Sequence, residues 1–160
     1  MDSRTANSVV TTKEPPMRSS FAGLDLIIPK EWLDITADLP EGSPPTLAKE
    51  TGIGVIQFSV AKYQSGATPS ITQKDLDGIF GKFCRDNSMR SVIAFPPMQG
   101  RVLRAGGTSS TRREFIAMWF LSDGRDVVMV TYTCLQAQDP IKEAELAQAA
   151  ELVNSIRLGG

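Results

Sequence analysis

The chain has 160 residues, a formal net charge of −1 and no histidine. Without imidazole it can build neither a Ser-His-Asp nor a Cys-His nucleophile system, and its two cysteines cannot supply an all-cysteine zinc site. A net charge near zero gives no overall attraction to nucleic acid or an anionic membrane, and no apolar run approaches the ~20 residues of a membrane-spanning helix. We therefore expect no metal, no cofactor, no nucleic acid and no membrane partner. The polar start, with no apolar stretch after it, predicts a cytoplasmic protein.

The first third of the chain is predicted to hold a tail and three strands. Residues 1–20 are rich in Ser, Thr and Pro and are expected to form a flexible tail, so the single domain spans 21–160. Period-two alternation predicts a strand over Leu24–Ile28, which Pro29 ends. After it we expect a proline-rich turn, a short strand and a longer strand, in that order Leu39–Pro45, Thr46–Leu47 and Ile53–Lys62.

A helix is predicted over Lys74–Asp86. Thr72 can accept the hydrogen bond of an N-cap, and Asp75 three residues later completes a capping box. The apolar residues of this segment recur at helical spacing and form one face, made of Leu76, Ile79, Phe80 and Phe83.

The strongest local signal is a β-hairpin late in the chain. Two β-rich runs, Phe115–Leu121 and Val127–Tyr132, flank Ser122–Arg125, whose Asp-Gly pair favours the left-handed torsions of a tight turn. A further strand over Arg101–Arg104 is expected to be separated from the hairpin by a flexible loop over Gly106–Ser110. The near-continuous apolar character of the hairpin predicts central strands covered on both faces, so its large aromatics belong to the core, namely Trp119, Phe120 and Tyr132.

The last predicted element is a helix over Pro140–Leu158, with Asp139 as N-cap and Gly159 as stop signal. Strands, a helix, a hairpin and a closing helix predict an α+β domain with a mostly antiparallel β-sheet flanked by helices. The acids of the final helix that we expect in solvent are Glu143, Glu145 and Glu151. Its expected buried stripe is Ile141, Ala144, Ala149, Leu152, Val153 and Ile156.

The partial catalytic motifs of the sequence have structural explanations. Gly81-Lys82 lacks the Ser or Thr that follows in a phosphate loop, and Gly52-Ile53-Gly54 leads into a strand instead of a helix. Cys84 and Cys134 read as two small buried thiols, with a disulfide open only if the fold brings them together. Two acidic pairs, Asp75 with Asp77 and Asp123 with Asp126, could serve in acid–base catalysis or bind a cation. A structural role is favoured, at a helix start for Asp75 and in a turn for Asp123.

Basic residues concentrate between positions 82 and 113, where only Asp86 opposes them. Scattered, solvated side chains are one explanation. The other is a face for an acidic partner, lined by Arg101, Arg104, Arg112 and Arg113, because arginine suits carboxylate forks and protein interfaces. Trp32 and Tyr63, at predicted loop or strand-end positions, either cover the edge of the core or anchor a partner, and core-edge packing is favoured. The candidate partner-binding residues are thus Arg101, Arg104, Arg112, Arg113, Trp32 and Tyr63.

The segment FAGLDLIIPKEWLDIT, residues 21–36, resembles the opening of bacterial domains with a PsbP-like fold: a strand, a proline, a tryptophan shortly after it, and then an Asp-x-Thr stretch. The late hairpin and the closing segment Asn154–Leu158 are similar as well, so that the resemblance covers about residues 21–158. It implies an antiparallel sheet flanked by helices. Non-enzymatic modules use this fold, among them a photosystem subunit, a Ran-binding factor, and bacterial chaperones or immunity proteins beside secreted toxins.

The resemblance and the missing catalytic residues together predict a non-enzymatic, cytoplasmic protein-binding module, monomeric or weakly homodimeric. Its expected role is that of an immunity protein that neutralises a cognate toxin by occlusion, with loops Ala105–Arg113 and Leu39–Lys49 as contact regions. One alternative is an adaptor chaperone for a type VI secretion effector, which needs an exposed hydrophobic groove. Others are a small-molecule or lipid carrier with a pocket between sheet and helix, and an enzyme that relies on Asp, Tyr and Arg.

Overall fold

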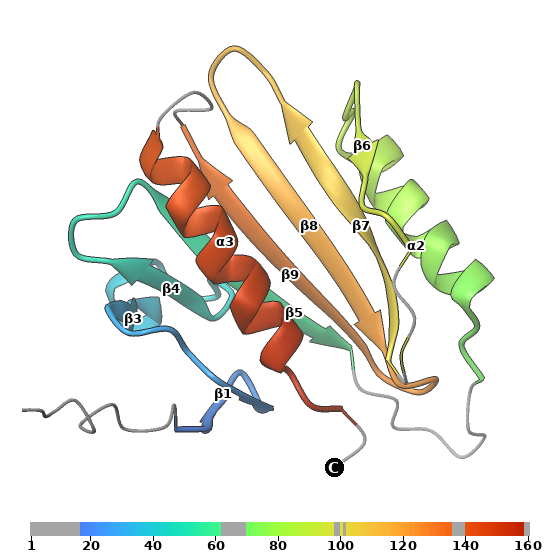
Figure 1. The fold of residues 1–160 in the computed structure, drawn as a ribbon, viewed down its shortest axis with the longest axis horizontal. Coiled ribbons are helices and arrows are strands. Elements are labelled where there is room, and N and C mark those ends of the chain that lie inside the picture. Colours follow the sequence, from blue (N-terminus) through green and yellow to red (C-terminus); the bar gives the residue numbers. More distant parts are fainter. Residues whose placement is uncertain (1–16, 62–69, 98–99, 101, 136–139, 159–160) are drawn as a thin grey trace, which may run out of the picture.

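The computed structural model describes residues 17–61, 70–97, 100, 102–135 and 140–158. It shows an α+β fold built on one seven-stranded sheet, in which every neighbouring pair of strands is antiparallel (Figure 1). The predicted fold class is therefore confirmed. In spatial order the strands are β3 (Trp32–Asp34), β4 (Thr46–Lys49), β5 (Gly54–Ala61), β9 (Val127–Cys134), β8 (Phe115–Ser122), β7 (Leu103–Ser110) and β6 (Ile93–Ala94).

The predicted hairpin is confirmed as β8 and β9, which lie at the centre of the sheet. Gly124 in its turn has φ +98°, a left-handed conformation that a side chain would disfavour. Asp123 accepts hydrogen bonds from the backbone N–H groups of Arg125 and Asp126, each at 2.9 Å. Burial opposes ionisation of Asp123, but these backbone hydrogen bonds outweigh it and lower the pKa of the carboxyl.

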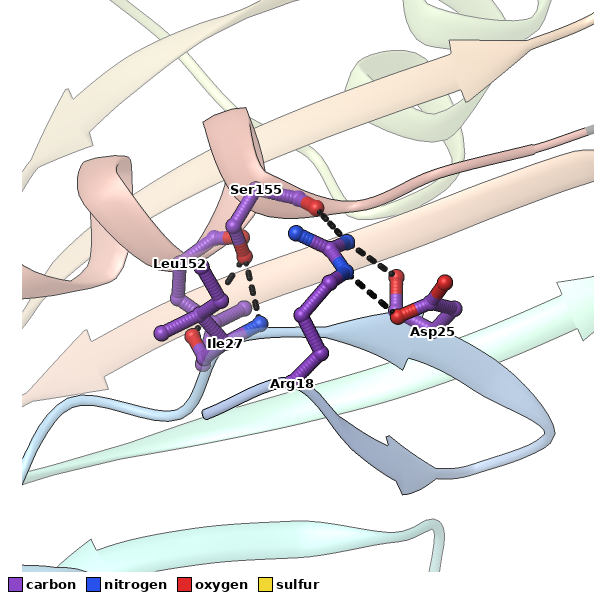
Figure 2. Close-up of polar contacts among 5 residues, drawn as sticks. All are labelled: Arg18, Asp25, Ile27, Leu152 and Ser155. Atoms are coloured by element: carbon purple, nitrogen blue, oxygen red, sulfur yellow. Dashed lines mark hydrogen bonds and ion pairs between the residues drawn. The ribbon is translucent and has the colours of Figure 1, made fainter. Parts of the chain in front are cut away.

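A separate two-stranded sheet, β1 (Ser19–Phe21) with β2 (Leu24–Leu26), lies at the C-terminal end of the last helix (Figure 2). Figure 2 shows the guanidinium of Arg18, which contacts the Asp25 carboxylate at 2.7 Å and also donates to the carbonyl of Ser155. The Ser155 hydroxyl accepts from the backbone N–H of Ile27 at 2.8 Å. Regular structure in the described part of the chain therefore includes Ser19 and Ser20, which the sequence analysis placed in the tail.

The two long helices pack on opposite faces of the sheet. Alternate residues of β8 establish this, because Ala117 and Leu121 belong to the cluster beneath α3 (Pro140–Ser155), whereas Met118 and Phe120 belong to the cluster beneath α2 (Gln73–Asp86). In Figure 1, α3 lies over β9 and β5, whereas α2 lies beside β7 at the other side of the sheet. A short 3-10 helix, η2 (Thr36–Asp38), connects β3 to β4.

The helix predicted at 74–86 is confirmed as α2, together with its capping box. Thr72 Oγ1 accepts from the backbone N–H of Asp75 at 3.1 Å, and Asp75 Oδ2 accepts from the backbone N–H of Thr72 at 2.9 Å. Leu76 is fully buried, and Phe80 and Phe83 both lie against the ring of Phe120. The predicted apolar face is thus used, except that Ile79 stays 37% exposed.

The predicted flexible loop at Gly106–Ser110 is wrong, because these residues form most of strand β7 and pair with β8. Its glycines are needed for close approach rather than for flexibility. A Cβ at Gly106 would lie 2.0 Å from the carbonyl oxygen of Met118, and one at Gly107 would lie 2.4 Å from that of Ile93. The composition suggested a loop, while the real constraint is the backbone of the neighbouring strands.

The predicted buried stripe of the last helix is correct in its C-terminal half and wrong at its start. Ala149, Leu152, Val153 and Ile156 are buried, but Ile141 is 44% exposed and Ala144 is also exposed. Glu145, expected in solvent, is completely buried. The face that α3 turns to the sheet therefore passes not through Ile141 but through Lys142, whose Nζ lies 4.3 Å from the centre of the Phe115 ring, and then through Glu145. The reason is a set of specific hydrogen bonds to that carboxylate, described below.

Both cysteines are free thiols; Cys134 is buried as expected, whereas Cys84 is only half-buried. They lie on opposite faces of the sheet, Cys84 in the α2 cluster and Cys134 in the α3 cluster. Burial raises the pKa of the Cys84 thiol. No helix among the residues described is long and apolar enough to cross a membrane.

Candidate functional site

A cleft of about 810 Å³ lies at the β7 edge of the sheet and is lined from both faces, by Trp119 and Leu146 from the α3 face and by Phe80 and Ala105 from the α2 face. We call it the Trp119 cleft. Most of its lining is apolar or aromatic, and its polar residues come from α2, β7 and α3. The aromatic and aliphatic lining consists of Phe80, Ala94, Phe95, Pro96, Pro97, Ala105, Trp119, Leu146 and Ala150, and the remainder of Gln73, Asp77, Arg104, Gly106 and Asn154.

The cleft exists because α3 does not extend over the whole face of the sheet. Trp119 of β8 points to the α3 side, and the ring of Phe95 stacks on its indole with centroids 5.6 Å apart and planes 20° apart. Opposite Phe95, α3 contributes Leu146, Ala150 and Asn154, which are spaced four residues apart and so share one side of the helix. The result is an apolar recess between α3 and the segment Phe95–Pro97, which we call the aromatic arm.

Polar groups gather where α2 meets the start of β7. Gln73 Nε2 donates to the carbonyl oxygen of Arg104 at 2.7 Å and to the carboxylate of Asp77 at 2.9 Å. The guanidinium of Arg104 donates to Asn154 Oδ1 on α3. The helices on the two faces are thereby joined around the edge of β7, and one end of the cleft is polar while the rest is apolar.

A buried carboxylate holds α3 against the sheet close to this cleft. Glu145 accepts hydrogen bonds from the backbone N–H groups of Gly54 at 3.0 Å and Ile53 at 3.2 Å, and from the Tyr132 hydroxyl at 2.7 Å. Lys49 Nζ lies 3.6 Å from the same carboxylate. Burial raises the pKa of the Tyr132 hydroxyl, and the neighbouring carboxylate raises it further, so the phenol remains a donor. This network is structural, because every acceptor site it offers is used.

The opposite face of the sheet has a region of different chemistry, which we call the threonine face; two of its residues, Thr46 and Thr131, are buried and the others are half-buried. It lies on β4, β5 and β9, away from β7 and β8, on which α2 packs. Its polar groups bond to one another: Gln57 Nε2 donates to Thr46 Oγ1 at 3.2 Å, and Thr46 Oγ1 donates to the carbonyl of Pro44 at 2.7 Å. Register places on this face Thr46, Ala48, Val55, Gln57, Thr131 and Thr133.

The six predicted partner-binding residues are not brought together. Arg104 lines the Trp119 cleft, whereas Arg112 and Arg113 are exposed in the turn at the far end of β7, roughly 25 Å away at the ~3.3 Å rise of each strand residue. Trp32 is only 5% exposed and its Nε1 donates to Gln148 Oε1 at 2.8 Å, which agrees with core-edge packing. Arg101 and Tyr63 lie outside the described residues.

The two acidic pairs serve local structure. Asp75 caps α2 and Asp123 closes the β8–β9 turn, as the sequence predicted. Hydrogen bonds from the backbone and then the side chain of Thr72 lower the pKa of the Asp75 carboxyl. Across the described part of the chain, no three Cys, Asp or Glu residues gather where they could hold a metal ion.

Sequence reasoning missed most of the cleft. Trp119 was expected in the core, yet it is only half-buried, and Phe120 and Tyr132 beside it are buried as predicted. The unused signals were the Phe95-Pro96-Pro97 run, which fits no regular element, and the second apolar line of the last helix through Leu146 and Ala150. Both lie far from β8 in sequence, so only the fold joins them to Trp119.

Comparison with protein-family models and with curated protein sequences gives no match. Among solved structures, the fold is similar to that of a protein from Bacteroides thetaiotaomicron VPI-5482 whose crystal structure was determined at 1.50 Å, with 12% sequence identity and a TM-score of 0.50. The match covers 86% of this chain and 46% of the other, so the chain spans about half the length of that relative. At this identity the similarity concerns the fold alone.

Proposed function

We propose that this chain is a non-catalytic protein-binding module that holds an apolar segment of a partner protein in the Trp119 cleft. The observation that carries the proposal is that the apolar side chains of Trp119, Phe95 and Leu146 line a cleft of about 810 Å³. Contiguous apolar surface of this kind is typical of interaction sites. This is the role of an adaptor chaperone for a secreted effector, acting in the cytoplasm as a monomer or weak homodimer.

The chemistry of the lining supports binding rather than catalysis. Its described residues include one carboxylate, Asp77, and one guanidinium, Arg104, and each is already hydrogen-bonded to a neighbour, Gln73 and Asn154 respectively. A general acid–base mechanism uses a second titratable group near the reacting bond. None of the described lining residues is Ser, Thr, Cys, Lys or Tyr, so the cleft offers no side-chain nucleophile of the usual kinds.

The test compares a cleft variant with a variant of the threonine face. Leu146→Asp places a charge in the cleft, and Thr133→Asp places the same charge at an equally half-buried position of the threonine face. Partner capture from the source cells, followed by titration of the purified partner, should be lost with Leu146→Asp and retained with Thr133→Asp, with circular dichroism confirming that both variants fold. Equal affinity for the partner in all three proteins would overturn the proposal. A small molecule released from the purified wild type, and absent from Leu146→Asp, would instead identify a carrier.

The second candidate is toxin occlusion by the arginine turn between β7 and β8. Thr111 fixes this turn, because its backbone N–H donates to the carbonyl of Glu114 at 2.8 Å and its Oγ1 accepts from the N–H groups of Arg113 and Glu114 at 3.2 and 3.1 Å. Arg112 and Arg113 are therefore exposed on a rigid support. Charge reversal of both should abolish neutralisation of a cognate toxin, and an unchanged affinity for the toxin removes this candidate.

A further inference from the structure

The conformation of the segment that occupies the Trp119 cleft can be argued from the hydrogen-bonding groups around it. This argument rests on the proposed function, because it takes the cleft to be the binding surface. A bound segment in a mostly apolar cleft must satisfy its own backbone polar groups, either internally or with groups of the cleft. The relevant question is therefore which donors and acceptors the cleft still offers.

The edge of β7 does not offer the acceptors that a partner strand needs. The carbonyl oxygen of Arg104 accepts from Gln73 Nε2 at 2.7 Å, and that of Gly106 accepts from the backbone N–H of Phe95 at 2.9 Å. Beyond them, β6 pairs with Gly107 and Thr108. A strand added at this edge would compete with bonds that are already made.

Donors, by contrast, are present. Within the described part of the chain, neither the indole N–H of Trp119 nor the amide N–H₂ of Asn154 has an acceptor. Arg104 donates to Asn154 Oδ1 and so orients this amide with its nitrogen away from the guanidinium. Trp119 is half-buried, Asn154 is exposed and both line the cleft, so a ligand carbonyl can accept from either donor. The cleft therefore combines aromatic surface and spare donors around Trp119 with occupied carbonyl acceptors at the edge of β7, and its side-chain acceptors, Gln73 Oε1 and Asp77 Oδ2, belong to the polar end.

We propose that the Trp119 cleft binds a proline-rich segment of the partner in the polyproline II conformation. Prolines carry no N–H, so they need no acceptor, and the carbonyl groups of this conformation are free to accept from Trp119 and Asn154. Pyrrolidine rings pack well on aromatic surface, which Trp119, Phe95 and Phe80 provide. The chain's own Pro96 and Pro97 already lie in the wall of this cleft.

The test uses N-acetyl decaproline as the probe and a Gly-Ser decapeptide as the control, followed by nitrogen-15 NMR of the two indole N–H signals. Trp119→Phe assigns the Trp119 signal by its disappearance. Decaproline should shift the Trp119 signal saturably and leave that of Trp32 in place, because the Trp32 indole is bonded to Gln148 in the core. The Gly-Ser peptide should shift neither signal.

Three variants measured by calorimetry sharpen the result. Trp119→Phe keeps an aromatic ring but removes the N–H, and Asn154→Asp keeps a partner for Arg104 but replaces a donor by an acceptor. Each should weaken decaproline binding about fivefold, the equivalent of one hydrogen bond. Glu151→Gln, exposed on the same helix, should bind as the wild type does.

No shift of the Trp119 signal at millimolar decaproline, or an equal shift with Gly-Ser, overturns the inference. Binding of a helical Leu-Ala peptide in place of decaproline also overturns it, but leaves the proposed protein-binding function standing. Decaproline binding without cleft-dependent partner capture supports the inference and contradicts the proposed function, so the two failures are distinguishable.

Discussion

Two regions of the same sheet, the Trp119 cleft and the threonine face, differ in chemistry and in exposure. The cleft is lined mostly by aromatic and aliphatic side chains around the half-buried Trp119. The threonine face, at β4, β5 and β9, consists mostly of threonine, glutamine and small residues; Thr46 and Thr131 are buried, and Gln57 donates to Thr46. Polar groups that already bond to each other need no partner, whereas open apolar surface is stabilised by a partner that removes it from water.

The position of the cleft follows from the placement of the helices. Because α2 and α3 pack on opposite faces and over different strands, α3 leaves Trp119 of β8 only half-buried. The same placement could have left a polar surface there, so the apolar character of the cleft comes from its side chains.

The largest expected effect comes from the buried carboxylate that fixes α3, the wall of the cleft. Glu145→Ala leaves the Tyr132 hydroxyl and the N–H of Gly54 without their acceptor, and should lower the free energy of unfolding by about 3–5 kcal/mol in urea denaturation. Glu151→Ala, exposed on the same helix, should change it by less than about 0.5 kcal/mol. Similar losses in the two variants would show that Glu145 does not anchor the helix.

Substituting two leucines of α3 compares the stability contribution of a core residue with that of a cleft residue. Leu152 is fully buried, so Leu152→Ala should cost about 2–5 kcal/mol of unfolding free energy. Leu146 is half-buried at the cleft, so the same substitution there should cost about 1 kcal/mol, while weakening partner binding. A stability loss at Leu146 equal to that at Leu152 would mean that this wall is core rather than an open surface.

A smaller effect is expected at the start of α2, which closes the polar end of the cleft. Thr72→Ala removes the side-chain cap of the helix and should cost about 1 kcal/mol in thermal or urea unfolding. Ser70→Ala, two residues earlier and also exposed, serves as the control and should be neutral. Partner affinity should change little in either variant, because neither residue lines the cleft.

The smallest effect is a dependence of stability on pH. The pKa of Asp75 is lowered in the folded state, so its contribution is present above the unfolded pKa of about 3.9 and is lost as the pH falls through the folded value. The urea midpoint of the wild type should therefore decline more steeply below about pH 4 than that of Asp75→Asn. Parallel curves for the two proteins would contradict the assigned ionisation of the capping box.

Local signals in the sequence were sufficient for elements whose residues interact with near neighbours. The capping box of Thr72 with Asp75 and the Asp-Gly turn at Asp123 were predictable because donors and acceptors lie within a few residues of each other. The apolar runs around that turn likewise predicted a central hairpin and, with the helices, the α+β class.

Long-range partners decided the rest. Composition predicted a loop at Gly106 and Gly107. It could not reveal that the carbonyl oxygens of Met118 and Ile93 leave no room for a side chain at these two positions. Glu145 was expected in solvent because the sequence does not show its hydrogen-bond donors. These are the Tyr132 hydroxyl and the backbone N–H of Gly54, which is 91 residues away.

The composition of the sequence, a near-neutral chain without histidine, already excluded imidazole chemistry and an overall electrostatic attraction to nucleic acid. Residue types alone determined this. The position of a binding surface was decided by tertiary structure, because Trp119, Phe95 and Leu146 come from a strand, an arm and a helix that are distant in sequence. Hydrophobicity can be read from each residue, but whether an apolar side chain becomes core or cleft depends on which helix lies over it.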